Sequence, residues 1–135
     1  MAHLPNAGLY NIFSNAVKTA AATILPDEDV LRGMTKATKK WTLTYVDQPN
    51  GVCMISDTLQ GGFLGLKQTA DVEMTGAIYL SGDQQRWILK KAGDDYTISQ
   101  MVNGEERFWY LAGLGDMIKT SSSEDKQTWE FELTS

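Results

Sequence analysis

The stretch Gln127-Thr128-Trp129-Glu130-Phe131 decides the fold, because two similar stretches occur earlier in the chain. Each copy has a polar residue, a spacer, a tryptophan and an alternating tail that is typical of a β-strand. The earlier copies are Lys39-Lys40-Trp41-Thr42-Leu43 and Gln85-Arg86-Trp87-Ile88-Leu89. Their tryptophans are separated by 46 residues (87 − 41) and 42 residues (129 − 87). A period of about 45 residues in a chain of 135 predicts three copies of one supersecondary unit.

A second marker precedes each tryptophan at a similar distance. Tyr10, Cys53 and Tyr96 lie at its centre, and they precede the tryptophans by 31 (41 − 10), 34 (87 − 53) and 33 (129 − 96) residues. Two markers that recur at a similar spacing in three copies predict a single domain, 1–135, with repeats at about 8–48, 49–92 and 93–135. The three marker stretches are Gly8-Leu9-Tyr10-Asn11-Ile12, Gly51-Val52-Cys53-Met54-Ile55 and Asp94-Asp95-Tyr96-Thr97-Ile98.

Short strands and glycine- or asparagine-rich turns alternate within each copy, which predicts about four strands per repeat and an all-β fold. We interpret residues 15–25 as a degenerate strand and loop of the first copy, closed by Pro26. A four-stranded unit cannot bury its own hydrophobic face, so the three copies should share one core by threefold closure. The other predicted second and third strands are Phe63–Leu66, Phe108–Leu111, Asp29–Arg32, Ala77–Leu80 and Asp116–Lys119.

The charge balance gives no reason to expect a nucleic-acid or anionic-membrane partner. The formal net charge is −5 and the isoelectric point about 4.7, and a basic footprint is the usual mark of such partners. The only local basic cluster, Lys36, Lys39 and Lys40, is interpreted as a solvated turn.

The chain shows no signal peptide and only one cysteine, Cys53, so no internal disulfide can form. The longest apolar stretch, Ala20–Leu25, is too short to span a bilayer. These features predict a protein that is cytoplasmic or secreted by an unconventional route, without membrane insertion.

The Gln-x-Trp element, the Gly-x-Tyr-x-Ile opening and the period resemble the ricin B-chain-like β-trefoil family over nearly the whole chain. The absence of disulfides is similar to the small fungal β-trefoil lectins. The first copy departs from the pattern, with Lys39 in place of glutamine. The resemblance implies a six-stranded barrel capped by three hairpins with pseudo-threefold symmetry. It also implies a non-enzymatic carbohydrate-binding protein with glycans as partners.

The repeated tryptophans have two interpretations. Trp41, Trp87 and Trp129 either fill equivalent points of a threefold core or stack on sugars, and we favour the core because a buried tryptophan contributes a large apolar area. Gln85 and Gln127 are then expected to hydrogen-bond turn backbone.

The carboxylate with which ricin-like domains grip a sugar, an aspartate ending the second strand, is missing from all three copies. Its place is taken by Gly65 in the second copy and Tyr110 in the third, and it falls near Ala21 in the first. Other aromatic, acidic and amide groups could replace it, and the second copy is the best candidate, although each is also an ordinary solvated loop residue on the alternative interpretation. The candidate carbohydrate-binding residues are Gln68, Asp71, Tyr79, Asp83 and Gln84 in the second copy and Trp109, Asp116 and Ser122, with Lys119, in the third.

No catalytic, metal or cofactor site is predicted. The only histidine is His3, and Cys53 occupies the place of Tyr10 and Tyr96, which suggests a buried thiol. A second hypothesis follows from a similarity in size and composition to fungal β-trefoil protease inhibitors. In that case an exposed loop would offer Arg32, Lys67 or, best placed in the turn 103–107, Arg107 to a protease. A third is a protein-interaction or storage role. Multivalent sugar binding would need several working sites or a homodimer.

Overall fold

The computed structural model describes residues 4–35, 39–59, 61–66 and 77–134, and regular structure in them is almost entirely β-strand. Two 3-10 turns, Gln48–Asn50 (η1) and Ser123–Asp125 (η2), are the exceptions within these residues. No helix in this described part is long and apolar enough to cross a membrane. The strands are β1 (Gly8–Ser14), β2 (Ala21–Thr23), β3 (Arg32–Met34), β4 (Trp41–Asp47), β5 (Val52–Asp57), β6 (Phe63–Leu66), β7 (Ile78–Ser81), β8 (Trp87–Ala92), β9 (Asp95–Val102), β10 (Glu105–Tyr110), β11 (Lys119–Ser121) and β12 (Trp129–Leu133).

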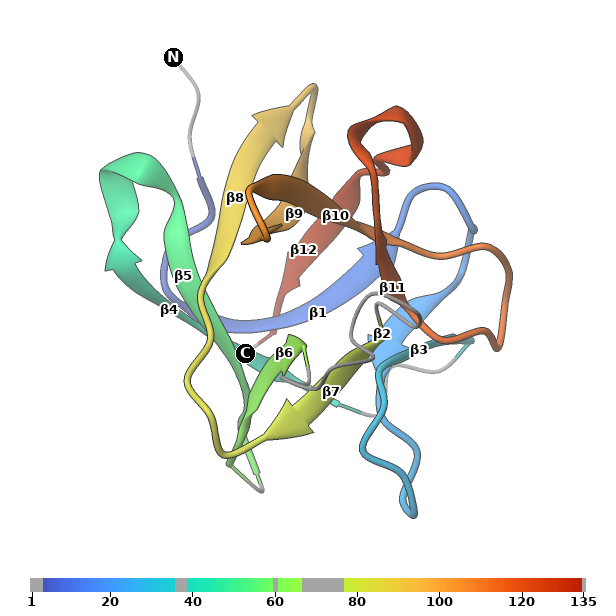
Figure 1. The fold of residues 1–135 in the computed structure, drawn as a ribbon. Helices are drawn as coiled ribbons and strands as arrows, with labels where there is room; N and C mark the ends of the chain where they lie inside the picture. The colour runs from blue at the N-terminus through green and yellow to red at the C-terminus, as the bar shows by residue number, and fades with distance from the viewer. Residues whose placement is uncertain (1–3, 36–38, 60, 67–76, 135) are drawn as a thin grey trace.

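Six strands close into a barrel (Figure 1). Each pairs antiparallel with the next in the order β1, β4, β5, β8, β9, β12 and back to β1. The other six form the hairpins β2–β3, β6–β7 and β10–β11, one from each repeat. This is the predicted β-trefoil: closure removes the free strand edges of the barrel, and the hairpins cap one of its ends.

The cap is held together by a ring of three backbone hydrogen bonds. The N–H of Leu31 donates to the carbonyl of Ile78 (2.8 Å), that of Ile78 to Ile118 (3.3 Å), and that of Ile118 to Leu31 (2.8 Å). All three side chains are fully buried. Each repeat therefore gives one bond and receives one, which is the pseudo-threefold relation in its most direct form. The same segments pair in a cycle through Val30–Tyr79, Ala77–Lys119 and Met117–Arg32.

The two sequence markers of each repeat lie opposite each other in the barrel, as register partners Tyr10–Trp41, Cys53–Trp87 and Tyr96–Trp129. The three tryptophans are at most 1% exposed, so the core interpretation is confirmed and sugar stacking by them is wrong. Each indole N–H donates to a carbonyl of the second strand or its equivalent, which satisfies the polar atom of a buried ring. The acceptors are the carbonyls of Ala22 (2.9 Å), Leu64 (2.9 Å) and Trp109 (3.4 Å) for Trp41, Trp87 and Trp129 respectively.

Two third strands begin later than predicted. β3 starts at Arg32 and β11 at Lys119, each three residues after the predicted start. The residues before them carry the cap ring instead, so their backbone groups bond between repeats rather than within a hairpin. β10 begins at Glu105, earlier than predicted, because the turn at Asn103 and Gly104, with φ of 52° and 81°, makes a tight β9–β10 hairpin.

Candidate functional site

The shared tryptophan hydrogen bonds define which hairpin positions are equivalent in the three repeats. The residue after each carbonyl acceptor is Thr23, Gly65 or Tyr110. Gly65 and Tyr110 are the positions predicted for the missing aspartate. In the first repeat the position is Thr23, two residues beyond the predicted Ala21. The neighbouring alanines are alike, so the sequence alone did not indicate which residue is the equivalent one.

Each of these positions faces a residue of the third strand, and the three pairs differ in chemistry. Cross-strand partners lie on the same face of a hairpin and are close enough to interact. The second repeat alone places an aromatic residue, Tyr79, opposite a glycine, Gly65, which adds no side chain of its own beside the ring. The three pairs are Thr23–Arg32, Gly65–Tyr79 and Tyr110–Lys119.

The side chain of Gln85 holds the backbone of the second hairpin, β6–β7, in place. The Oε1 atom of Gln85 accepts from the N–H of Leu66 (2.8 Å), and its Nε2 donates to the carbonyl of Leu66 (2.6 Å). A Cβ atom on residue 65 would lie 2.3 Å from the Gln85 side chain, so the clamp occupies the space that a side chain at Gly65 would need. Gln127 makes the same pair of bonds to Leu111, at 2.9 and 3.0 Å. The predicted turn-bonding role of both glutamines is confirmed.

Three of the five candidates of the second repeat lie in described residues. Tyr79 is half-buried on β7, and Asp83 and Gln84 are exposed in the connection to β8. The backbone N–H of Asp83 donates to the Ser81 hydroxyl (3.2 Å), which holds the start of this connection in a turn. Gln68 and Asp71 lie outside the described residues, and their roles stay predictions.

Trp109 is wrong as a candidate for sugar contact. It is 0% exposed and packs edge-on against Trp87 and Trp129, with ring centroids 5.7 and 5.4 Å apart. A sugar needs the face of an accessible ring, and both faces of this one belong to the core. Phe108, Trp109 and Tyr110 are aromatic without alternation, so the sequence could not tell which ring points outward. In the structure Tyr110 is the half-buried one.

The third repeat keeps polar groups around its hairpin but spreads them over a long connection. Asp116 is exposed in a turn closed by its own N–H and the carbonyl of Gly113 (3.1 Å). Lys119 is exposed opposite Tyr110. Ser122 immediately precedes η2, where its carbonyl accepts the N–H of Asp125 (3.1 Å).

The two arginines proposed for protease contact, Arg32 and Arg107, already bind groups of their own chain. Arg32 binds Glu28 (Nε–Oε1, 2.7 Å) and the Gly115 carbonyl (3.2 Å), and the Glu28 hydrogen bond raises the pKa of the guanidinium. Arg107 lies in strand β10, not at a loop tip, and its Nη2 donates to the carbonyl of Thr120 (2.9 Å). The predicted loop presentation of Arg107 is therefore wrong. Lys67 lies outside the described residues.

A buried ion pair replaces the glutamine clamp in the first repeat, and sequence reasoning missed it. The Nζ atom of Lys39 lies 2.9 Å from Oδ2 of Asp57, with the side chains 14% and 1% exposed. The equivalent pair in the second repeat is Gln85 with Gln100, whose amide N–H donates to Gln85 Oε1 (3.3 Å). The interpretation of Lys39 as part of a solvated turn is therefore wrong. The one signal in the sequence was the departure of Lys39 from the repeated glutamine.

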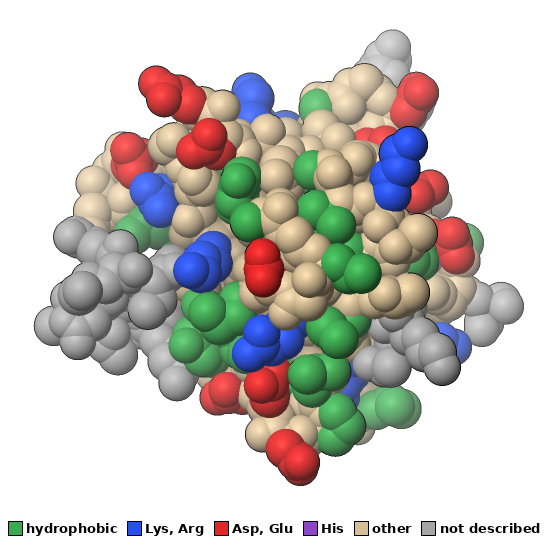
Figure 2. All heavy atoms as spheres, turned by 90° about the vertical axis from the view of Figure 1, so that its right-hand side faces the viewer, with side chains coloured by type: hydrophobic (Ala, Val, Ile, Leu, Met, Phe, Trp, Pro, Cys, Tyr) green, Lys and Arg blue, Asp and Glu red, His purple; other side chains and the backbone are tan. Residues whose placement is uncertain are grey.

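The Cys53 thiol is not placed for covalent chemistry. Burial raises the pKa of the Cys53 thiol to about 12, so it stays protonated and cannot act as a nucleophile at neutral pH. His3 lies outside the described residues. Within the described ranges no three His, Cys, Asp or Glu side chains gather as a metal site would require. Figure 2 shows that acidic and basic side chains are interspersed on the face that lies on the right in Figure 1.

No protein-family model matches the chain, and no curated protein sequence matches it. Solved structures do match. A ricin B-like lectin of Macrolepiota procera in complex with lactose superposes with a TM-score of 0.75 at 14% identity, covering 98% of this chain and 100% of that one. The Polyporus squamosus lectin bound to a human-type influenza-binding epitope gives 0.74 at 18%, over 96% of this chain and 50% of that one.

A salivary protein of Culex quinquefasciatus from a cysteine- and tryptophan-rich family gives 0.75 at 13% identity, covering 98% of this chain and 96% of that one. The chain spans half the length of the Polyporus squamosus protein. At these identities the similarity establishes the fold alone, a β-trefoil like that of the ricin B-like lectins, and confirms the predicted fold.

Proposed function

We propose that the protein binds carbohydrate through the second-repeat surface around Tyr79, without catalysing a reaction on it. The observation that carries the proposal is the pairing of Tyr79 with Gly65 on a hairpin clamped by Gln85. The fold supports it, because solved structures with this fold include a lectin in complex with lactose. The residues that we assign to the site are Gln68, Asp71, Tyr79, Asp83 and Gln84.

The chemistry of these groups suits a sugar. The ring of Tyr79 is an apolar surface for the C–H face of a pyranose, and its hydroxyl adds a polar edge. Carboxylates and amides such as those of Asp83 and Gln84 accept and donate hydrogen bonds to neighbouring hydroxyls. Because Gln85 already fixes the hairpin backbone, ordering that part of the site on binding costs little.

The third repeat offers a second, weaker surface under this proposal, with Asp116 and Ser122 around Tyr110. Because Trp109 is buried in the core, the only aromatic ring that we assign to this surface is that of the half-buried Tyr110. We also propose that the chain is one domain whose repeats are those predicted, at about 8–48, 49–92 and 93–135. One strong site would make multivalent binding depend on a dimer.

The proposal is tested on a glycan array with the wild-type protein, followed by titration of the best glycan. Tyr79→Ala should weaken binding at least about tenfold, which corresponds to roughly 1.4 kcal/mol. Tyr110→Ala makes the same change on the weaker surface of the third repeat and shows which of the two surfaces carries the binding. It should change the affinity less than about twofold. Thermal unfolding of both variants verifies that they fold.

Two results would contradict the proposal. One is the absence of binding to any glycan, most of all if the protein inhibits a serine or cysteine protease instead. The other is glycan binding that Tyr79→Ala and Asp71→Ala both leave unchanged, which would place the site elsewhere on the molecule.

A further inference from the structure

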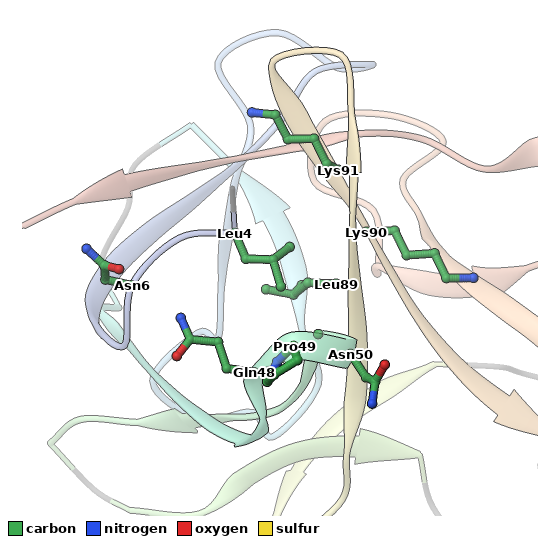
Figure 3. Close-up of a pocket in the computed structure, with 9 residues that line it drawn as sticks. Leu4, Asn6, Gln48, Pro49, Asn50, Leu89, Lys90 and Lys91 are labelled. Carbon is green, nitrogen blue, oxygen red and sulfur yellow. The ribbon is translucent and has the colours of Figure 1, made fainter. Parts of the chain in front are cut away.

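A pocket of about 620 Å³ lies at the end of the barrel opposite the hairpin cap. β4 runs from the cap, where Trp41 lies, to the turn η1, so η1 marks the opposite end. The pocket is open to solvent and is lined by η1, strand β8 and the chain that leads into β1, as Figure 3 shows. Its volume falls within the range of about 300–1,000 Å³ that small-molecule sites occupy.

One wall is the segment before β1, which two tyrosines fasten to the barrel. The hydroxyl of Tyr10 donates to the carbonyl of Asn6 (2.6 Å), and that of Tyr45 to the carbonyl of Pro5 (2.5 Å). Desolvation by burial raises the pKa of both tyrosines, so both remain donors at neutral pH. Leu4 packs against the hydrophobic core beneath. The segment is therefore bound to the barrel along its length.

The opposite wall is the turn η1, which is longer than the equivalent turn of the next repeat. The β4–β5 register shifts between Tyr45 and Asp47, and η1 follows this bulge, whereas β8 and β9 join through a tight turn whose flanking pair is Ala92–Asp95. Gly51, with φ of 72°, ends the turn, and a Cβ there would lie 2.2 Å from the Leu89 carbonyl. The extra residues make room for a pocket at this turn, and Gly51 seats the turn directly on β8.

The lining combines an apolar surface with amides and a positive charge. Leu4, Pro49 and Leu89 supply the apolar part, and the side-chain amides of Asn6 and Gln48 lie at the rim. None of the lining residues is acidic, in a protein whose net charge is −5. The net negative charge of the protein repels an anion, so any attraction to this pocket comes from the local lining groups.

Of the two lysines that line the pocket, Lys91 is the one whose charge is not neutralised. Lys90 binds Glu106 (Nζ–Oε2, 2.9 Å) and points away from the pocket in Figure 3. Lys91 makes no ion pair with a described residue, and its Nζ lies 5.1 Å from the centroid of the Tyr96 ring. A flexible ammonium at the edge of a partly apolar pocket is suited to an anionic group at one end of a ligand.

We propose that this pocket binds a small amphipathic anion, a molecule with an apolar ring or short chain and a single acidic group such as a carboxylate or sulfonate. The apolar part lies against Leu4, Pro49 and Leu89, and the acidic group lies near Lys91. The amides of Asn6 and Gln48 bind any further polar atoms. This site is separate from the carbohydrate surface, which lies on the hairpin of the second repeat.

A pair of fluorescent probes tests the proposal. 8-Anilinonaphthalene-1-sulfonate has two aromatic parts and one negative charge, and N-phenyl-1-naphthylamine has the same rings without the charge. Lys91→Gln should weaken sulfonate binding at least fivefold and leave the uncharged probe within twofold. The matched control is Lys126→Gln, since Lys126 also lies over an aromatic ring, 5.8 Å from the centroid of Phe108, but outside the pocket. This control should change neither affinity.

A second measurement locates the probe directly. On titration with the sulfonate, the amide NMR signals of Gly51, Leu89 and Lys91 should shift, and those of Gly82 and Asp83 should not. Equal effects of Lys91→Gln and Lys126→Gln, shifts confined to other parts of the chain, or no sulfonate binding at millimolar concentration would each overturn the proposal.

Discussion

The residue two positions before the repeated tryptophan is held by different partners in the first and second repeats. In the second repeat the neutral amide of Gln85 bonds both backbone groups of Leu66 and is supported by Gln100. In the first, Lys39 reaches instead to the carboxylate of Asp57, which is 1% exposed. The difference shows that the same position is anchored either by a neutral amide network that also clamps the hairpin or by a buried ion pair with strand β5. A neutral network tolerates the loss of one member, whereas a buried charge without its partner does not.

Removal of Asp57 should give the largest effect. Asp57→Ala leaves the largely buried Lys39 ammonium unpaired and should lower the free energy of unfolding by about 3 kcal/mol. Gln100→Ala, the equivalent change in the second repeat, removes a neutral partner and should cost about 1 kcal/mol. Urea denaturation at pH 7 measures both. Equal costs would show that the two anchors are energetically alike and would break the comparison.

The double variant Lys39→Gln with Asp57→Gln sharpens the comparison by transferring the second repeat's solution into the first. It should recover most of the stability that Asp57→Ala loses, because replacing both charges leaves no buried ion unpaired. A double variant as unstable as Asp57→Ala would mean that the surrounding backbone of the first repeat, and not the charge, requires this pair.

The second prediction concerns Gly65, the hairpin position beside the Gln85 clamp. A Cβ at residue 65 would lie 2.3 Å from the Gln85 side chain. Gly65→Ala should therefore displace the clamp from Leu66 and destabilise the protein by about 2 kcal/mol through the loss of its two hydrogen bonds. Thermal unfolding should show no further loss when the same substitution is made in a Gln85→Ala background. Gly82→Ala, where a Cβ meets no atom within 4 Å, is the control and should stay within about 0.5 kcal/mol.

The third and smallest prediction extends the comparison to the third repeat. Ser99 and Ser56 face Phe108 and Phe63 at equivalent points, but only the buried Ser99 donates to a carboxylate, Glu106 Oε2 (2.6 Å). Ser99→Ala should cost about 1.5 kcal/mol at pH 7, as for other hydrogen bonds to charged groups. The matched change Ser56→Ala should cost less than about 0.5 kcal/mol.

The cost of Ser99→Ala should also depend on pH with a defined sign. The Ser99 hydrogen bond, and then Lys90, lower the pKa of Glu106 below its ordinary value of 4.5. A lowered native pKa contributes stability that is full above the unfolded value and is lost as the pH falls through the native one. The difference between wild type and Ser99→Ala should accordingly shrink in denaturation experiments below about pH 4.5. A difference that stays constant down to pH 2 would contradict this assignment.

The sequence predicted the fold from features that are local and repeated. The tryptophans and their upstream markers keep step along the chain, and in the barrel they are register partners, for example Tyr10 with Trp41. Third-strand boundaries were displaced because the backbone of Leu31 and Ile118 bonds between repeats, and no local pattern reports such bonds.

The candidate site was less accessible to sequence reasoning, because exposure there depends on packing between repeats. Trp109 looked like a surface aromatic until its contacts with Trp87 and Trp129 placed it in the core. The pocket beside Lys91 combines a segment before β1 with a strand some 85 residues later in the chain, and no spacing rule connects them.

The ring of hydrogen bonds among Leu31, Ile78 and Ile118 makes the repeat at which the chain begins immaterial to the cap. A cycle in which each member gives and receives one bond has no first member. Thr134 also lies beside the start of β1, because its N–H donates to the carbonyl of Leu9 (3.0 Å). A chain joined near these points and reopened at the exposed Gly82 turn would therefore keep the ring. Such a circular permutant would begin with β8 of the second repeat and keep the same cap.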